Sequence, residues 1–382
     1  MMKETDKIQE EYIDNKPTGL EYEEPGDSER NISKPYDPRQ IRVDPKPLSI
    51  AQAMDLIQGG ELNIAPEFQR RRVWNNVQKS LLIESIMLRI PLPVFYFSAD
   101  EEGRMEVVDG VQRLSTMQDF TNNRFSLSSL EYLSQVLDGK KYEDIKNSMW
   151  SRRFLTTSLV AYVIDPQTPD TVKFDIFRRI NTGGTPLNAQ EMRHCISKSR
   201  SRDFLAALCA KPEFHQATRQ QLKDNSRMMD MELALRYCAF SLLEDIDKYN
   251  EYEGLDDMLT KTVGKLDHSV TDDRLQMLES GFVRAMKNVR ELFGDHAFCK
   301  WRVDNNYLSP INRALFDAWS VLLATADPSK ILQHKESIVR DAREMMSNDN
   351  DFFSSISYGT SKYSQVTMRF EKVEALLGRY LP

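Results

Sequence analysis

Apolar residues recur along the chain at two different spacings, and the pattern changes near residue 198. Before this position, short apolar runs typical of strands alternate with segments of helical period. After it, almost every segment has the helical period and none has a convincing strand pattern. The chain is therefore predicted to have an α+β fold, in which a small mixed α/β domain over residues 47–197 precedes an all-α helical domain over residues 198–382.

Capping signals mark the helices of the mixed domain. The first helix is expected to end at Gly59, since glycine is typical just after a helix. Asn75 and Gln78 have the spacing of a capping box at the start of the next helix. The same spacing recurs at Asn188 and Glu191. The other expected elements are helices over residues 111–123 and 170–180, and strands over residues 94–97, 105–108 and 156–165.

Residues 1–46 lack this patterning. They are acidic, rich in Pro, Asp and Glu, and poor in aliphatic side chains. Such a segment does not bury enough apolar surface to offset the entropy that it loses on ordering. The sequence predicts a disordered acidic tail.

Charge and cysteine spacing narrow the class of protein. The 382 residues carry a net charge of −7, which argues against a protein that coats nucleic acid but leaves room for a local basic pocket. The four cysteines are widely separated and form no Cys-x-x-Cys pair, so they indicate reduced thiols and no zinc site. With no apolar leader and no run of membrane-spanning length, we expect a cytoplasmic protein without a membrane partner.

Three polar stretches lie at the ends of predicted elements and are rich in amide or guanidinium donors. They are PEFQRRRVW at residues 66–74, DGVQR at residues 109–113 and RRINTGGTPL at residues 178–187. Taken singly, each has a plain structural explanation: a solvated arginine loop, a helix cap with a surface salt bridge, and a glycine turn. Taken together, the three stretches fit one anion-binding pocket.

The DGVQR stretch turns a predicted buried strand directly into a helix, which aims unpaired backbone N–H groups beyond the strand. Gly110 lacks the Cβ that would keep a ligand from the backbone. Arg113 stands where the helix dipole disfavours a cation, so a facing anion would explain it, and its guanidinium fits two phosphate oxygens. Asp109 has three open roles, which are to hold a metal-bound water, to orient an arginine or to cap the helix.

The order of the three stretches resembles the N-terminal domain of GmrSD-type restriction endonucleases, also called domain of unknown function 262. The resemblance is strong over residues 48–200 and has weaker motifs in the helical half, where RMMDMELALRYCAF and SPINRALFDAW are similar to stand-alone members. It implies a fold related to ParB and sulfiredoxin, with a pocket for Mg²⁺ and a nucleoside triphosphate (NTP). It also implies NTP hydrolysis in the service of defence against foreign DNA.

The family's Asp-Gly-Gln-Gln-Arg signature falls on residues 109–113, with Val111 in place of the first glutamine. If Val111 faces the core, nothing is lost; if it faces the nucleotide, hydrolysis or base choice is affected. The resemblance implies catalysis by Asp109, Gln112 and Arg113, metal binding by Asp109, and cofactor binding by Gln69, Arg70, Gly110, Gln112, Arg113, Asn181, Gly183 and Gly184.

GmrSD-type enzymes cut DNA with a separate His-Asn-His nuclease domain, and no segment of this sequence has its pattern. The nearest is FGDHAFCKWRVDNNYLSP, which holds His296 with Asn305 and Asn306, and a structured loop between helices explains it better. The nuclease is then expected in a partner chain, or it is absent.

Two functions of different classes fit the three stretches. The first is an NTP-binding and NTP-hydrolysing module that regulates a DNA-acting partner in restriction or antiviral defence. The second is a non-catalytic module that binds DNA or senses a modified base. A nuclease in its own right ranks last, because no carboxylate cluster of the two-metal kind is visible. The helical half alternates charges, as at Glu232 and Arg236, and this favours the nucleotide interpretation over a basic DNA clamp.

Overall fold

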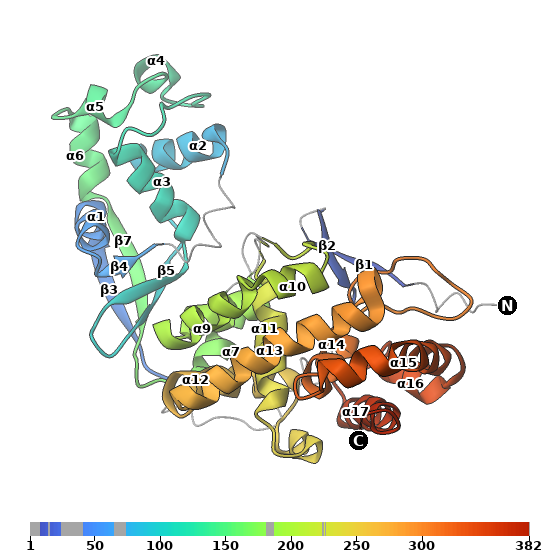
Figure 1. Cartoon of the computed structure of the whole chain (residues 1–382). Coiled ribbons are helices and arrows are strands. Elements are labelled where there is room, and N and C mark those ends of the chain that lie inside the picture. Colours follow the sequence, from blue (N-terminus) through green and yellow to red (C-terminus); the bar gives the residue numbers. More distant parts are fainter. Residues whose placement is uncertain are drawn as a thin grey trace. The chain divides into compact units, whose positions relative to one another are not determined.

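The computed structural model describes residues 8–13, 16–23, 41–64, 74–180, 187–223, 225 and 227–381. The chain forms two compact units (Figure 1). We call Tyr36–Ile196 the mixed unit, and Met1–Pro35 together with Ser197–Pro382 the helical unit. In sequence, the mixed unit is an insertion into the helical unit, and it ends one residue before the predicted domain border.

The mixed unit is built on a sheet of strands β3 (Val43–Ser49), β4 (Leu62–Asn63), β5 (Phe95–Ala99), β6 (Met105–Asp109) and β7 (Ser158–Ile164). The strand order is β3-β7-β5-β6-β4. β5 and β6 are antiparallel and form the predicted hairpin, whereas β4 runs parallel to β6 and β5 runs parallel to β7. β3 pairs antiparallel with β7 at the other edge. This mixed sheet, followed by helices, confirms the predicted α+β class.

The helices of the mixed unit are α1 (Ile50–Gln58), α2 (Asn76–Met87), α3 (Val111–Thr121), α4 (Ser134–Leu137), α5 (Tyr142–Ile145), α6 (Met149–Thr156), α7 (Asp170–Ile180) and α8 (Ala189–Ile196). Apolar side chains of α1, α2, α3 and α6 share one core with sheet residues such as Phe97 and Val107. The predicted capping box is confirmed: the Asn75 side chain accepts from the Gln78 N–H at 2.9 Å, and the Gln78 side chain accepts from the Asn75 N–H at 3.1 Å.

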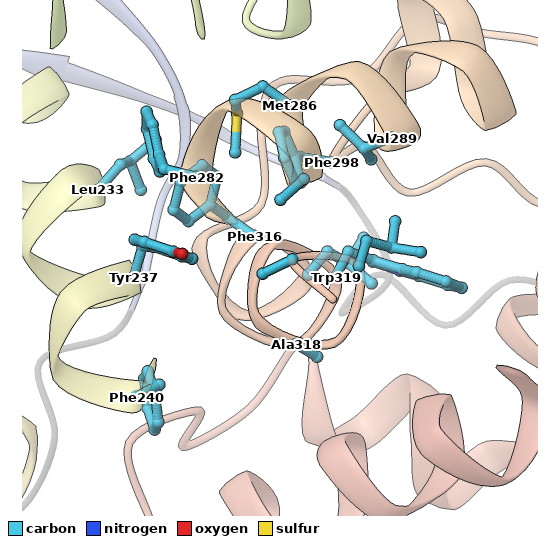
Figure 2. Packing of buried hydrophobic residues seen from close by; sticks show 14 of the residues in the cluster. Leu233, Tyr237, Phe240, Phe282, Met286, Val289, Phe298, Phe316, Ala318 and Trp319 are labelled. Carbon is cyan, nitrogen blue, oxygen red and sulfur yellow. The ribbon is translucent and has the colours of Figure 1, made fainter. Parts of the chain in front are cut away.

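The helical unit contains α9 (Ser199–Cys209), α10 (Pro212–Ala217), α11 (Met229–Ser241), α12 (Leu255–His268), α13 (Asp272–Phe293), α14 (Arg313–Leu322), α15 (Pro328–Asn348), α16 (Asn350–Ser355) and α17 (Tyr363–Gly378). Short 3₁₀ turns lie at Ile246–Glu251 and Gly294–His296. Aromatic side chains of α11, α13 and α14 meet in its core, where Tyr237 and Phe282 lie 5.0 Å apart between ring centroids (Figure 2).

The N-terminal segment predicted to be disordered contains a β hairpin. β1 (Glu10–Ile13) pairs antiparallel with β2 (Lys16–Glu21). Leu20 is fully buried in the core of the helical unit. Beside it, the N–H of Ile311 donates to the carbonyl of Gly19 at 2.9 Å, and the N–H of Glu21 donates to the carbonyl of Ile311 at 2.8 Å. The hairpin is thus an integral part of the helical unit.

The prediction of a disordered tail over residues 1–46 is therefore wrong for residues 8–13 and 16–23. It is also wrong for residues 43–46, which belong to β3. The physical reason is that the acidic side chains of the hairpin are paired with cations of the helical unit, and a carboxylate with such partners does not need bulk water.

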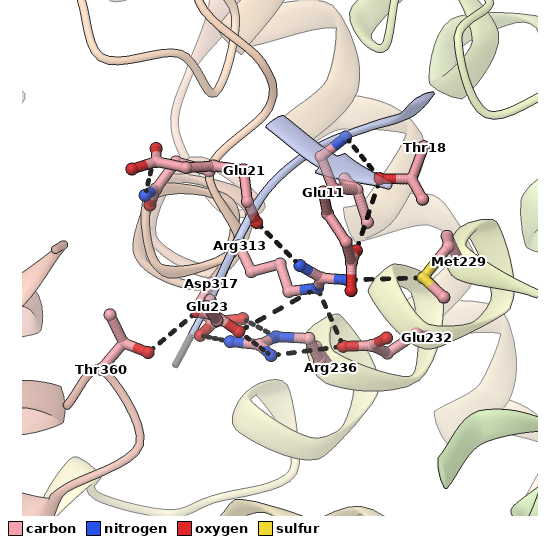
Figure 3. Close-up of polar contacts among 12 residues, drawn as sticks. Glu11, Thr18, Glu21, Glu23, Met229, Glu232, Arg236, Arg313, Asp317 and Thr360 are labelled. Atoms are coloured by element: carbon pink, nitrogen blue, oxygen red, sulfur yellow. Dashed lines mark hydrogen bonds and ion pairs between the residues drawn. The ribbon is translucent and has the colours of Figure 1, made fainter. Parts of the chain in front are cut away.

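A buried ion network joins α11, α14 and α17, and Figure 3 shows its members Arg236 and Asp317. Asp317 of α14 is completely buried and accepts two hydrogen bonds from Arg236 of α11, both at 2.8 Å, and one from Arg369 of α17 at 2.9 Å. The predicted pair of Glu232 and Arg236 is present at 3.4 Å. Arg236, however, is buried and belongs to this network, so the pair does not lie on a solvated surface.

Candidate functional site at the junction of β6 and α3

The DGVQR stretch forms the junction between β6 and α3, and the sheet brings other segments to it. β4 and β6 are parallel, so both strands end at the same edge of the sheet. β5 is antiparallel to β6 and begins there, with Tyr96 paired to Asp109. The arginine-rich segment 65–73 follows β4 closely, and Trp74, which comes directly after it, donates its N–H to the side chain of Gln112 at 3.3 Å. Trp74 is therefore held at this junction.

Gly110 alone separates β6 from α3. Its φ is +102°, a left-handed conformation that favours glycine. A Cβ at this position would lie 2.3 Å from Cδ1 of Phe95, which is closer than two carbon atoms can approach without displacement. The group that closely approaches the backbone of Gly110 is therefore the Phe95 ring of the core. As the N-cap of α3, Gly110 provides no side-chain hydrogen bond to the first N–H groups of the helix.

Arg113 lies across the junction and contacts both sides of it. Its Nη2 donates to Asp109 Oδ2 at 2.9 Å and to the carbonyl of Val94 at 3.2 Å, and its Nη1 donates to the carbonyl of Pro93. The guanidinium also lies over the Phe95 ring, 4.4 Å from its centroid. Burial lowers the pKa of Arg113, and the ion pair with Asp109 opposes this effect.

The sequence left two interpretations of Arg113, which are contact with a bound anion and a salt bridge to a carboxylate. The structure contains the salt bridge. It differs from the expected surface pair, because only 12% of the Arg113 side chain is exposed. The anion that makes an arginine favourable in the first turn of α3 is Asp109, four residues before it. A direct contact of Arg113 with phosphate stays a prediction.

Two other signature residues differ in burial: Val111 lies in the core, and Asp109 is partly exposed. Val111 is buried and belongs to the core of the mixed unit, so the departure from the signature falls on a side chain that faces inward. Asp109 keeps 33% of its side chain exposed although it pairs with Arg113. The carboxylate is thus oriented by Arg113 and still open to solvent at the carboxyl end of β6.

Residues 53–197 match the family described as GmrSD restriction endonuclease, N-terminal domain. This segment is therefore similar to the GmrSD N-terminal domain. The match begins within α1 and ends one residue after α8, so it includes the whole sheet except β3 and the complete β6–α3 junction. No curated protein and no solved structure matches the chain.

The junction assembles four of the expected site residues: Asp109, Gly110, Gln112 and Arg113. The remaining ones, Gln69, Arg70, Asn181, Gly183 and Gly184, lie outside the described residues. Of their neighbours in sequence, Trp74 donates its N–H to Gln112, and Ile180 is the last residue of α7.

Two features of the β6–α3 junction were not expected from the sequence. The first is the pair of carbonyls, at Pro93 and Val94, that Arg113 binds. The second is the Phe95 ring that fills the space beside Gly110. The strand pattern signalled that a β strand begins here, but only the pairing of β5 with β6 shows that its start lies beside the end of β6.

Within the part of the chain that the structure describes, no group of three or more His, Cys, Asp or Glu side chains is placed to hold a metal ion. The expected loop at His296 is present: its ring stacks on Trp301 with centroids 4.1 Å apart, and the Trp301 indole donates to Asn306 at 3.3 Å. These contacts support the interpretation of this segment as a structured loop. In the part of the chain that the structure describes, no helix has both the length and the apolar character needed to cross a membrane.

Proposed function

We propose that the mixed unit of this protein binds and hydrolyses a nucleoside triphosphate and that the protein thereby regulates a DNA-acting restriction or antiviral defence system. The family match supports the role in restriction. The observation that carries the nucleotide site is the uncapped start of α3 at the end of β6, where Gln112 accepts from the N–H of Trp74, the residue that directly follows the arginine-rich segment. Cationic side chains and helix N–H groups at one sheet edge suit a polyphosphate.

Each residue of the junction receives a role in this proposal. The N–H groups at the start of α3 and the guanidinium of Arg70 bind phosphate oxygens, while Gln69 and Gln112 donate neutral hydrogen bonds. Arg113 holds the carboxylate of Asp109 in place through the 2.9 Å ion pair, and so it acts on the nucleotide by positioning. Asn181, Gly183 and Gly184 complete the pocket as the resemblance implies.

Asp109 is the residue that fits a divalent cation. Mg²⁺ is commonly bound by one or two carboxylates together with substrate phosphates, and Asp109 offers one partly exposed carboxylate at the edge where the phosphates are placed. When bound, the cation would neutralise charge on the phosphates. Asp109 orients the attacking water, and the arginines and helix N–H groups stabilise the negative charge of the transferring phosphoryl group.

The role of Arg70 is testable with a charge-matched pair of variants. Arg70→Gln is expected to weaken NTP binding at least tenfold, because a hydrogen bond to a charged group contributes about 1.5–3 kcal/mol. Arg104→Gln removes the same charge at an exposed position in the turn between β5 and β6 and is expected to bind like the wild type. Isothermal titration calorimetry in the presence of Mg²⁺ measures both. Equal affinities of the two variants would remove Arg70 from the site, and binding of duplex DNA in place of NTP would favour the non-catalytic DNA-binding module.

A further inference from the structure

Two tyrosines form a pair on the face of the sheet that points away from the core of the mixed unit. Tyr96 of β5 and Tyr162 of β7 are partners in the parallel register of these strands. Their rings are stacked, with centroids 5.6 Å apart and an angle of 23° between the planes. Side chains alternate between the two faces of a sheet, and Phe95, Phe97 and Ala161 belong to the core of the mixed unit. The two tyrosines therefore lie on the opposite face.

The surroundings of this pair are apolar and open to solvent. Tyr96 and Tyr162 are both partly exposed. Val160, two residues before Tyr162 on the same face of β7, is 47% exposed. Val160 and Tyr162 are paired with Pro47 and Pro45 of β3, and both prolines are exposed. We call these residues, Tyr96, Val160, Tyr162, Pro45 and Pro47, the aromatic face.

The hydroxyl groups of the two tyrosines are accessible. Among the described residues, neither Tyr96 nor Tyr162 makes a hydrogen bond through its hydroxyl, and neither hydroxyl belongs to the buried atoms that lack a partner. Both hydroxyls therefore reach solvent, and each is able to donate and to accept a hydrogen bond. The pair thus offers a flat ligand an aromatic surface together with polar groups at its rim.

The charges on this side of the sheet exclude a phosphate ligand. Among the strand residues that the structure describes, the alternation of side chains places one charged group on this face, and it is the carboxylate of Glu106 in β6. An acidic group repels phosphate, whereas an uncharged heterocycle is not affected in this way. The aromatic face therefore suits a neutral aromatic ligand, or the neutral part of a larger one.

The aromatic face begins next to the β6–α3 junction. Tyr96 is the second residue of β5 and pairs with Asp109 at the end of β6. Neighbouring strands lie about 4.8 Å apart, so the backbone of Tyr162, one strand further, is about 10 Å from that of Asp109. A nucleotide with its phosphates at the start of α3 is long enough to extend past the start of β5 and to place its base over the tyrosines.

We propose that the aromatic face binds the base of the nucleotide, with Tyr96 and Tyr162 as its stacking partners. This inference rests on the proposed nucleotide site at the junction and names the residues that hold the base. The two parts of the site then match the two parts of the ligand. Helix N–H groups and arginines bind the charged phosphates, and the uncharged aromatic face binds the base, since every base has a π face that stacks on aromatic side chains.

The first test uses the wild-type protein and separates the base from the rest of the nucleotide. Affinities for the four common NTPs and for ribose 5-triphosphate, which has no base, are measured by calorimetry with Mg²⁺. We expect the NTP that binds best to bind at least tenfold more tightly than ribose 5-triphosphate. If ribose 5-triphosphate binds as tightly as every NTP, the phosphate site stands and the base site is wrong. If none of the five ligands binds, the proposed function fails as well.

The second test removes one ring at a time. Tyr96→Leu and Tyr162→Leu are each expected to weaken NTP binding at least fivefold and to leave the affinity for ribose 5-triphosphate within twofold of the wild type. Tyr162→Phe keeps the ring and should stay within threefold of the wild type. The control, Tyr132→Leu, removes a tyrosine that is 74% exposed elsewhere in the mixed unit. A folded leucine variant that binds NTP like this control, or that loses both ligands equally, overturns the inference.

A third test needs no substitution, because a cross-strand aromatic pair also stabilises a sheet and its loss could unfold the variants. The wild-type protein is irradiated with the NTP that binds best, carrying a photoreactive azide on its base, and the labelled peptides are identified by mass spectrometry. The label is expected in the peptides that contain Tyr96 or Tyr162 and should disappear when unmodified NTP is added in excess. Competed label that is confined to other segments would place the base elsewhere and contradict the inference.

Discussion

Replacing Asp317 by asparagine is expected to lower the free energy of unfolding of the helical unit by about 3–5 kcal/mol. Asp317 is completely buried and supplies the carboxylate that pairs Arg236 of α11 with Arg369 of α17. Asparagine has nearly the same shape but no charge, and its amide places N–H donors against guanidinium donors. Arg236 and Arg369 then stay buried without their principal anion. Removing one partner of a buried ion pair costs more stability than replacing the whole pair by apolar residues.

The matched control for this change is Asp295→Asn. Asp295 pairs with Arg290 at 2.6 Å, but 66% of its side chain is exposed, and exposed pairs contribute at most about 1 kcal/mol. Urea denaturation followed by circular dichroism measures both variants. If the free energies of unfolding of the Asp317 variant and the control differ by less than about 1 kcal/mol, the network does not hold the three helices together in the way described.

Gly110→Ala is expected to lower stability by about 3 kcal/mol or more, because it combines backbone strain with a steric clash. The alanine Cβ would meet the Phe95 ring at 2.3 Å, and the φ of +102° is itself unfavourable for a side chain. Gly103→Ala is the control: its φ is +81°, but no atom lies within 4 Å of the added Cβ. This control should cost only about 1 kcal/mol.

The origin of the Gly110 effect can be separated with a second substitution. Phe95→Leu shortens the ring that the new Cβ would meet, so the double variant should lose less stability than the sum of the two single changes. Additive losses would show that the backbone conformation, and not the ring, requires glycine. Differential scanning calorimetry of the wild type, the two single variants and the double variant provides the stabilities for this double-mutant cycle.

Local signals were sufficient to predict most of the mixed unit. The capping boxes at Asn75 and Asn188 were identified because all of their atoms lie within four consecutive residues. The hairpin of β5 and β6 follows from alternating apolar positions on either side of a polar turn. The position of Arg113 at a helix start was also visible, and it left a bound anion and a salt bridge as alternatives. The structure shows the salt bridge, to Asp109, and a bound anion stays a prediction.

The N-terminal hairpin of β1 and β2 shows where sequence reasoning fails. Its composition is that of a solvated acidic tail, and this holds for most such segments because isolated carboxylates prefer water. Here Glu11 and Glu21 find Arg313 and Lys300, which lie 302 and 279 residues further along the chain. A partner at that distance leaves no trace in local composition. The cluster of buried arginines at Arg236, Arg313 and Arg369 was also hidden, because it forms only when α11, α14 and α17 are packed together.

Nucleotide binding by the purified wild-type protein tests the central claim most directly. The protein is incubated with Mg²⁺ and each of the four common NTPs, and bound nucleotide and released phosphate are measured in the same samples. The account predicts saturable binding of at least one NTP with a Kd below about 1 mM, the upper end of ordinary substrate affinities, together with phosphate release that Asp109→Asn abolishes. If none of the four binds at that concentration, the β6–α3 junction is not a nucleotide site.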